Sequence, residues 1–350
     1  MEVGGNVQGY AFPDSIAFGA GKEDCGGVEA PFMFGYAMAQ GKRDYMEDRV
    51  VAKQIATADG GVGHVLAVFD GHGGSEAANW ASSNVWKRVE DLLVLGEEPE
   101  EALRTAFMSV DEEWCDWARA NGDDDSGSTG LVCLVLGSTV YCASAGDGAA
   151  VVLRNGADPE MLSTPHKPDS PGEEKRIRKL GGKVIFRDCA RLNGILAVSR
   201  AIGDAELKKY VISDPEMRAV LRSKTQRFVI LATDGLWDVF TNDEAVRFIE
   251  DHWDEEGHGA KACAQEAYNR GSFDNVCVMV VDLLGGQGLA PLNPHAADDS
   301  SELSDEILDA GSSTSLQDES PEEAALRASN PALDDGNYMS HPPPRMSDFA

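Results

Sequence analysis

The chain has 350 residues, and its 60 Asp and Glu outnumber its 30 Lys and Arg, which gives a formal net charge of −30 at pH 7. A charge of this sign argues against nucleic acid or an anionic membrane as the main partner, because both would repel the protein. A hydrophobic content of 42% still allows a sizeable core, so the chain is not disordered throughout. The carboxylates must therefore either solvate a folded surface or hold cations.

The cysteines and the N-terminus indicate where such a protein would work. The seven cysteines include no CxxC pair and no zinc-ligand spacing, which is typical of reduced thiols in the cytosol or nucleus. The N-terminus has neither the apolar run of a signal peptide nor the glycine that myristoylation needs, and no apolar stretch is long enough to span a membrane. We therefore expect a soluble cytoplasmic or nuclear protein, and no sequence feature indicates anything other than a monomer.

The first part of the chain predicts a loose lead-in followed by strands and a pair of helices. Residues 1–30 are glycine-rich and weakly patterned. Short β-type runs follow at 50–56 and 64–69. Amphipathic periodicity then predicts helices over about 74–95 and 98–119.

The middle of the chain is rich in strand patterns. Apolar runs at 131–136 and 139–145 predict a hairpin around the two-residue loop Gly137-Ser138. The β pattern continues at 151–154. A short helix is expected at 173–180, where two glycines follow it.

The last third of the folded part repeats this mixture. An apolar strand is expected at 228–232, helices at about 242–252 and 259–269, and a final strand at 276–281. Antiparallel-type strands with helices in pairs, rather than a strict alternation of strand and helix, indicate an α+β fold built in layers. We place the folded domain at residues 31–285.

Residues 286–350 are expected to be a disordered acidic tail. Between residues 290 and 350 there are 13 acidic residues against two arginines, with many serines and prolines and almost no periodicity. Phosphorylation of the tail, or binding of a basic partner, would give it a function. An ordinary disordered terminus is the simpler interpretation.

Acidic side chains stand where the apolar strands end, often next to glycine. An Asp at such a junction can point into a shared cleft, while the glycine lets the backbone or a ligand come close. One Asp-Gly pair alone usually marks a turn, but several at strand ends are hard to explain as turns. Oxygen ligands of this kind suit hard divalent cations such as Mg²⁺ and Mn²⁺. The residues concerned are Glu47, Asp48, Asp70, Asp147, Asp234 and Asp274.

These carboxylates lie within a series of short motifs. The motifs are Arg43–Asp48, Val68–Gly74, Gly127–Gly130, Gly146–Gly148, Leu196–Asp204, Ala232–Asp238 and Asp274–Val276. In their order and spacing they resemble the PPM/PP2C family of metal-dependent protein serine/threonine phosphatases, over roughly Gly35 to Leu284. The resemblance implies a central β-sandwich of two antiparallel sheets flanked by pairs of antiparallel helices, which agrees with the α+β pattern.

The resemblance also implies two divalent metals in a cleft above the sandwich. Asp70 is similar to the bridging ligand of the family. Glu47 and the Gly71 carbonyl would bind one ion with it, and Asp234 and Asp274 would bind the other. Two such ions would activate a shared water for direct attack on phosphorus, with no phospho-enzyme, and would offset the phosphoryl charge. Mg²⁺ and Mn²⁺ suit these ligands equally.

A weaker third metal site of the family resembles the position of Asp147 together with Asp234. The usual Gly-Asp-Ser-Arg reads Gly146-Asp147-Gly148-Ala149 here, so the arginine side chain is missing and only the Asp is carried over. Asp48 is expected to orient metal-bound water from behind the ligands rather than to bind an ion itself.

Two further residues are implied to act on the phosphate. Arg43 is expected to clamp phosphoryl oxygens with paired hydrogen bonds, although outside the motif it would be interpreted as a surface arginine paired with Asp44 or Glu47. His72 is expected to protonate the leaving seryl or threonyl oxygen, although a histidine after Asp-Gly is often only a loop residue. Asp204 is interpreted as architectural, with contact to metal-bound water as the less favoured alternative.

Residues 163–187 fall where the family carries its flap, a variable segment beside the cleft. The usual Asp-His-Lys-Pro reads Pro165-His166-Lys167-Pro168 here. A basic run inside the flap could draw in phosphoproteins, but a solvated helix face is the simpler interpretation. The run consists of Lys175, Arg176, Arg178 and Lys179.

The leading hypothesis is an active Mg²⁺- or Mn²⁺-dependent phosphatase that acts on phosphoproteins. A cysteine-based tyrosine phosphatase is a poor competitor, because the sequence has no His-Cys-x₅-Arg loop. Two binding proteins remain as alternatives: a pseudophosphatase that keeps the fold without the chemistry, and an interaction protein that works through its acidic tail. A pseudophosphatase typically lacks one or more metal carboxylates, and every expected one is present here.

Overall fold

The computed structural model describes residues 17–23, 32–122, 124–154, 157–222, 226–255, 257–284 and 308–309. Of the predicted lead-in, only residues 17–23 are among these ranges, and of the predicted acidic tail only residues 308–309 are. Within the described ranges, no helix combines the length and the apolar character that crossing a membrane requires.

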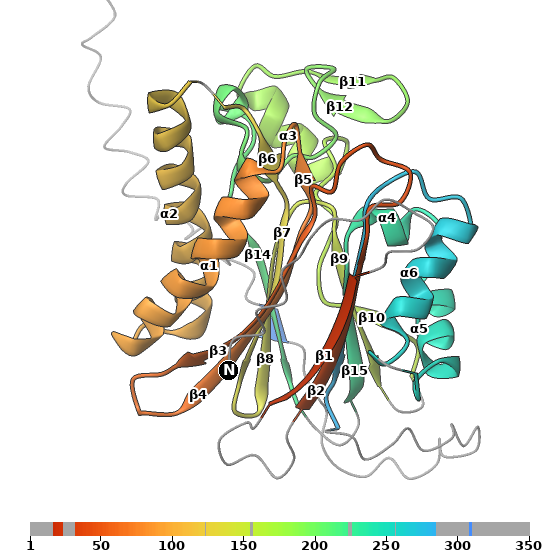
Figure 1. Ribbon diagram of the computed structural model, residues 1–350. Coiled ribbons are helices and arrows are strands. Elements are labelled where there is room, and N and C mark those ends of the chain that lie inside the picture. The colour runs from red at the N-terminus through yellow and green to blue at the C-terminus, as the bar shows by residue number, and fades with distance from the viewer. Residues whose placement is uncertain are drawn as a thin grey trace, which may run out of the picture. The chain divides into compact units, whose positions relative to one another are not determined.

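Two antiparallel sheets of six strands each form the centre of the fold (Figure 1). The first sheet has the order β1 (Ala17–Glu23), β2 (Phe32–Ala39), β16 (Val276–Asp282), β15 (Gln226–Ala232), β9 (Ala149–Arg154) and β10 (Glu160–Met161). The second has the order β17 (Leu308–Asp309), β14 (Glu216–Leu221), β8 (Thr139–Ala145), β7 (Gly130–Leu136), β4 (Val62–Phe69) and β3 (Arg49–Ala56). The hairpin predicted around Gly137-Ser138 is β7–β8.

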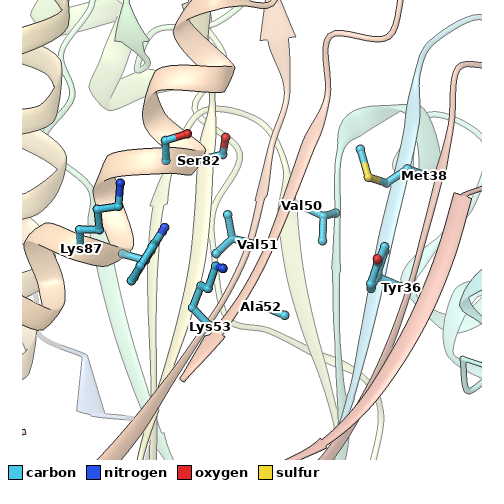
Figure 2. A pocket seen from close by; sticks show the side chains of 10 residues that line it. Tyr36, Met38, Val50, Val51, Ala52, Lys53, Ser82 and Lys87 are labelled. Atoms are coloured by element: carbon cyan, nitrogen blue, oxygen red, sulfur yellow. The ribbon is translucent and has the colours of Figure 1, made fainter. Parts of the chain in front are cut away.

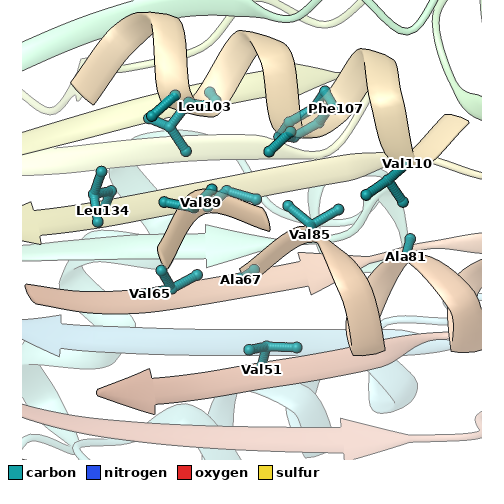
Figure 3. Packing of buried hydrophobic residues seen from close by; sticks show 14 of the residues in the cluster. Val51, Val65, Ala67, Ala81, Val85, Val89, Leu103, Phe107, Val110 and Leu134 are labelled. Carbon is teal, nitrogen blue, oxygen red and sulfur yellow. The ribbon is translucent and has the colours of Figure 1, made fainter. Parts of the chain in front are cut away.

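A pair of helices covers the outer face of each sheet (Figure 1). The helices α1 (Glu76–Val94) and α2 (Pro99–Ala120) cover the second sheet, and α5 (Asn242–Asp251) and α6 (Ala260–Asn269) cover the first. In α1, Ala81, Val85 and Val89 recur every fourth residue and are buried against that sheet (Figure 3). The predicted α+β class, a β-sandwich flanked by helix pairs, is confirmed.

The three largest clusters of buried apolar side chains form three layers. Side chains from both sheets, including Leu66 and Leu231, fill the space between the sheets. Leu103 and Phe107 of α2 close the layer under the first helix pair (Figure 3), and Ile249 belongs to the layer under the second. Each fully buried side chain of this size stabilises the fold by roughly 1.5–3 kcal/mol.

The sequence does not predict β1, β2 or β14. β1 lies inside the predicted lead-in, so this part of the lead-in is a strand paired with β2. β2 is covered on both faces: Phe34 and Met38 face the other sheet, while Ala37 and Ala39 face the helices. Its sequence is therefore apolar at nearly every position and lacks the alternation that marks a half-buried strand.

Short elements surround one end of the sandwich. β5 (Gly71–His72), β6 (Gly127–Ser128) and β13 (Ile202–Gly203) form a small sheet, followed by the 3₁₀ turn η1 (Ala205–Leu207). The flap region contains α3 (Pro171–Lys179) and the hairpin of β11 (Val184–Phe186) and β12 (Ala190–Leu192). The short helix α4 (Asp234–Trp237) follows β15.

Candidate active site

Three carboxylates converge where strands of both sheets end. Asp70 follows β4, Asp147 lies in the turn after β8, and Asp234 opens α4 after β15. One oxygen atom from each carboxylate lies within 4.8 Å of those from the other two. Because β4 and β8 belong to one sheet and β15 to the other, the group exists only when the sandwich has assembled.

The backbone around Asp70 is held on both sides. The Thr129 N–H donates to the Asp70 carbonyl at 2.8 Å, and the Asp70 N–H donates to Thr129 Oγ1 at 3.2 Å. Residue 71 must be glycine, since a Cβ there would lie 2.6 Å from the Glu47 carbonyl oxygen. This close approach brings the Glu47 segment against the end of β4.

The three carboxylates line a cleft of about 550 Å³. Most of the residues predicted for the site also line it. They are Arg43, Asp70, Gly71, His72, Asp147, Asp234 and Asp274.

Glu47 and Asp48 lie beside the cleft. Glu47 lines a neighbouring cavity of about 420 Å³, and its Oε1 accepts a hydrogen bond from the Gly74 N–H at 2.8 Å. Asp48 is buried, and its Oδ2 accepts from the Thr233 hydroxyl at 3.0 Å. Thr233 precedes Asp234 directly, so Asp48 fixes the backbone from which Asp234 projects.

Burial and mutual repulsion disfavour the ionised forms of the carboxylates in the cleft. Burial, together with the carboxylates of Asp48, Asp234 and Asp147, raises the pKa of Asp70 well above its ordinary value. Burial, followed by the charges of Asp147 and Asp274, raises the pKa of Asp234 to about 7. A divalent cation among these oxygens would relieve both effects, so the donor set fits Mg²⁺ or Mn²⁺.

Lys167 faces the same carboxylates and was not singled out from the sequence. Its ammonium contacts Asp147 and lies 3.8 Å from Asp234 Oδ2. Burial lowers the pKa of Lys167, but Asp147 and Asp234 outweigh it and raise the pKa overall. Asp238 also lines the cleft, and burial raises its pKa although Lys167 opposes the shift. Both residues stand in motifs of the sequence, and only the fold shows that they line the same cleft.

Arg43 pairs with a different acid from those that the sequence suggested. Its NH2 donates to Asp274 Oδ2 at 2.6 Å, rather than to Asp44 or Glu47. Asn275 holds the loop in place, because its Nδ2 donates to the carbonyls of Gln40 and Tyr45 at 2.7 and 2.9 Å. The guanidinium is thus kept at the mouth of the cleft, half exposed.

His72 has a carboxylate partner that the sequence did not reveal. Its Nε2 lies 2.9 and 3.0 Å from the two oxygens of Asp204, whose backbone is left-handed at φ 55°. Burial lowers the pKa of His72, but Asp204 outweighs it and raises the pKa overall. Gly127 makes room for the pair, since a Cβ there would lie 2.3 Å from both side chains. Asp204 therefore contacts a cleft residue directly, beyond its expected architectural role.

Two arginines of the basic run in the flap form local hydrogen bonds and ion pairs. Arg176 donates to Glu173 at 2.6 Å and to the Ser199 carbonyl at 2.9 Å, and Arg178 pairs with Glu174 at 2.6 Å. These contacts favour a structural role for the two arginines. Lys175 and Lys179 are exposed.

Sequence comparisons point to one family. The family model described as "Protein phosphatase 2C" matches residues 33–276. "Probable protein phosphatase 2C 59" of Oryza sativa subsp. japonica is 38% identical over 278 residues, covering 79% of this chain and 84% of that protein. "Probable protein phosphatase 2C 59" of Arabidopsis thaliana is 38% identical over 266 residues, covering 75% and 84%.

Solved structures share the fold. The "Crystal structure of serine-threonine phosphatase 2C from Toxoplasma gondii" superposes with a TM-score of 0.63 at 21% identity, covering 75% of this chain and 98% of that one. The "Structure of a C.elegans sex determining protein" superposes with a TM-score of 0.63 at 24% identity, covering 77% and 65%. At these identities the similarity concerns the architecture.

Proposed function

This chain belongs to the protein phosphatase 2C family and is a protein phosphatase of that type. We propose that it hydrolyses phosphoserine and phosphothreonine with the help of divalent metal ions. The observation that carries the proposal is the convergence of Asp70, Asp147 and Asp234 in one cleft. Arg43 and His72 line the same cleft, so binding, activation and proton transfer would have candidate groups within one space.

The metal ligands in this proposal are oxygen atoms of the chain. Asp70, Asp234 and Asp274 would hold two ions, together with Glu47 and the Gly71 carbonyl, and Asp147 would contribute to a weaker third site. When bound, Mg²⁺ or Mn²⁺ would supply Lewis-acid activation of water and offset the charge of the phosphoryl group. Glu47 would have to turn from the Gly74 N–H toward the cleft, since it lines the neighbouring cavity.

Arg43 would bind the phosphoryl oxygens. A guanidinium can donate two parallel hydrogen bonds to a phosphate, which orients it as well as attracting it. Its ion pair with Asp274 is half exposed at the mouth of the cleft. Exchange of this carboxylate for a substrate phosphate would therefore need only a small movement.

His72 would donate the proton to the leaving oxygen. The Asp204 carboxylate holds Nε2, so Nδ1 would be the donating nitrogen. An acid that protonates the leaving group contributes typically 10²–10⁴-fold to such reactions. Asp204 would act by orienting the ring and by keeping the protonated form populated.

The alternative of a pseudophosphatase is disfavoured by the complete set of carboxylates. The test is release of phosphate from a phosphothreonyl peptide, measured with Mn²⁺, with EDTA and for Asp70→Asn. We expect turnover with Mn²⁺ and a loss of turnover in the other two cases. Activity that survives chelation, or an undiminished rate in the variant, would overturn the metal-dependent mechanism. No turnover under any condition would favour the pseudophosphatase.

A further inference from the structure

A second opening lies on the side of the sandwich, away from the carboxylates. It has a volume of about 270 Å³, and we call it the β3-edge pocket (Figure 2). Its lining includes Val50–Lys53 of β3, Trp86 and Lys87 of α1, and Tyr36 of β2. Four consecutive residues of β3 form one wall, α1 supplies a second, and β2 of the other sheet supplies the third.

The wall formed by β3 is the open edge of a sheet. β3 is the last strand of its sheet and pairs only with β4 among the described residues. At one end the Ala56 N–H points away from β4 and donates to Glu90 Oε1 at 2.8 Å. Backbone groups alternate along an antiparallel strand, so those of Ala52 and Gln54 point to the same side as that of Ala56. An extended peptide could pair with this stretch as an added strand.

The side chains at this edge carry positive charge. The ammonium groups of Lys53 and Lys87 lie 5.3 and 5.5 Å from the centroid of the Trp86 ring. Neither lysine forms an ion pair with a described residue, and no acidic side chain lines the pocket. Glu90, one turn along α1 from Trp86, is turned toward Ala56 instead. In a chain with twice as many acids as bases, this arrangement leaves two cations without an acidic partner among the described residues.

We propose that the β3-edge pocket binds an extended acidic segment of a partner protein, which pairs with β3 and places its carboxylates beside Lys53 and Lys87. Cations set apart on both β3 and α1 suit a ligand with several spaced acids, and side chains on one face of a strand repeat every second residue. The net charge does not oppose this, because charges beyond a Debye length of about 8 Å are screened at physiological salt. Nucleic acid or an anionic membrane would instead bring many negative charges against a chain whose net charge is −30.

The test measures binding directly and uses no turnover, so its outcome is independent of the proposed phosphatase mechanism. The probe is a fluorescent peptide of alternating glutamate and threonine, titrated with the full chain at physiological salt and followed by anisotropy. We expect saturable binding that K53E/K87E weakens by about tenfold or more. The neutral variant K53Q/K87Q should give an intermediate loss. The matched control R247E/K261E changes the charge equally on the opposite helix layer and should bind like the wild type.

Backbone pairing is tested with two further peptides, N-methylated either on every glutamate or on every threonine. Only one set of N–H groups can face β3, so one peptide should lose binding and the other should keep it. The proposal would be overturned if K53E/K87E bound the peptide as tightly as the wild type does. It would also be overturned if the two methylated peptides bound equally, or if inorganic phosphate alone displaced the probe. Absence of binding to the wild type would overturn it too, and would leave the lysines as guards against edge-to-edge aggregation.

Discussion

The cleft and the β3-edge pocket carry charged side chains of opposite sign. The cleft gathers Asp70, Asp147 and Asp234 from strand ends, with oxygen atoms within 4.8 Å of one another. Asp147 is buried and the other two are partly buried. The β3-edge pocket presents Lys53 and Lys87 beside a strand edge, with an aromatic ring near both ammonium groups. Strand ends of two sheets bring three like charges into one cleft, whereas the two lysines come from a strand and a helix and lie near the same aromatic ring.

This difference shows that burial, more than net charge, decides whether a group of charged side chains needs a counter-ion. Carboxylates that are buried and close repel one another strongly, because little water remains to screen them. They need a cation to ionise fully. Partly exposed lysines over a ring need no counter-ion to be stable. We therefore expect catalysis in the cleft to depend on metal and peptide binding at the pocket to depend on salt. We also expect substitutions in one opening to leave the other unaffected.

The largest effect should come from changing the cleft alone. Asp234→Asn removes one oxygen charge from the centre of the carboxylate group, and we expect kcat to fall about 10²–10³-fold, as for loss of one catalytic electrostatic contact. The assay is phosphate release from a phosphothreonyl peptide at saturating Mn²⁺. Asp116→Asn, an exposed acid on α2, is the matched control. Acidic-peptide binding at the β3-edge pocket should be unchanged, and a parallel loss there would show that the two openings are not independent.

A second change separates proton donation from metal binding within the cleft. In His72→Ala we expect kcat for a phosphothreonyl peptide to fall about 10²-fold, because the leaving oxygen loses its acid. An aryl phosphate needs less protonation, so its loss should be much smaller. Asp204→Asn should show the same substrate dependence in weaker form, since it orients the ring. Equal losses on both substrates would contradict the acid role of His72.

The pH dependence of metal binding sharpens the contrast between the openings. The pKa of Asp234 is raised to about 7, so protons compete with metal below that pH. Apparent Mn²⁺ affinity should rise at least tenfold from pH 5 to 6, because the protons of Asp234 and of Asp70, whose pKa is raised too, both compete with the metal. Titration calorimetry measures this. Above about pH 6, where the glutamates of the peptide are ionised, peptide binding to the lysines should not change with pH. A flat Mn²⁺ affinity from pH 5 to 6 would contradict the raised pKa.

The same shift has a consequence for stability. The folded, metal-free state holds the Asp234 proton to a higher pH than the unfolded chain, so unfolding releases protons between about pH 4 and 7. The free energy of unfolding should therefore fall as pH rises through this window. Saturating Mn²⁺ should remove the slope, because the paired carboxylates are then ionised in the folded state. Thermal unfolding with and without Mn²⁺ checks this.

Much of the fold follows from the sequence because its signals are local. Apolar periodicity predicts α1 and α2, and a two-residue loop predicts the β7–β8 hairpin. β2 escapes prediction because it is buried on both faces, which removes the alternation that a pattern search uses. The carboxylates of the cleft are visible in the sequence because each stands at a strand end.

The contacts between site residues do not follow from the sequence, because they depend on packing between distant segments. The partner of Arg43 is Asp274 rather than a neighbour along the chain. Asp204 reaches His72 only because β13 and β5 pair with the same short strand, β6. Lys167 gives no local signal of its own, and its place between acids from two sheets emerges only when both sheets are in position.

Lys167 differs from Lys53 and Lys87, because its ammonium is paired with a carboxylate of the cleft. Its ammonium contacts Asp147 and lies 3.8 Å from Asp234, so a cation entering beside Asp147 must displace it. We expect Lys167→Met to tighten the weaker Mn²⁺ site by about fivefold, which is the upper range for a partly exposed ion pair. Calorimetry measures the change, and Lys208→Met, which removes a lysine paired with Asp111 outside the cleft, is the control. Weaker Mn²⁺ binding in Lys167→Met would mean that the ammonium organises the carboxylates for metal rather than competing with it.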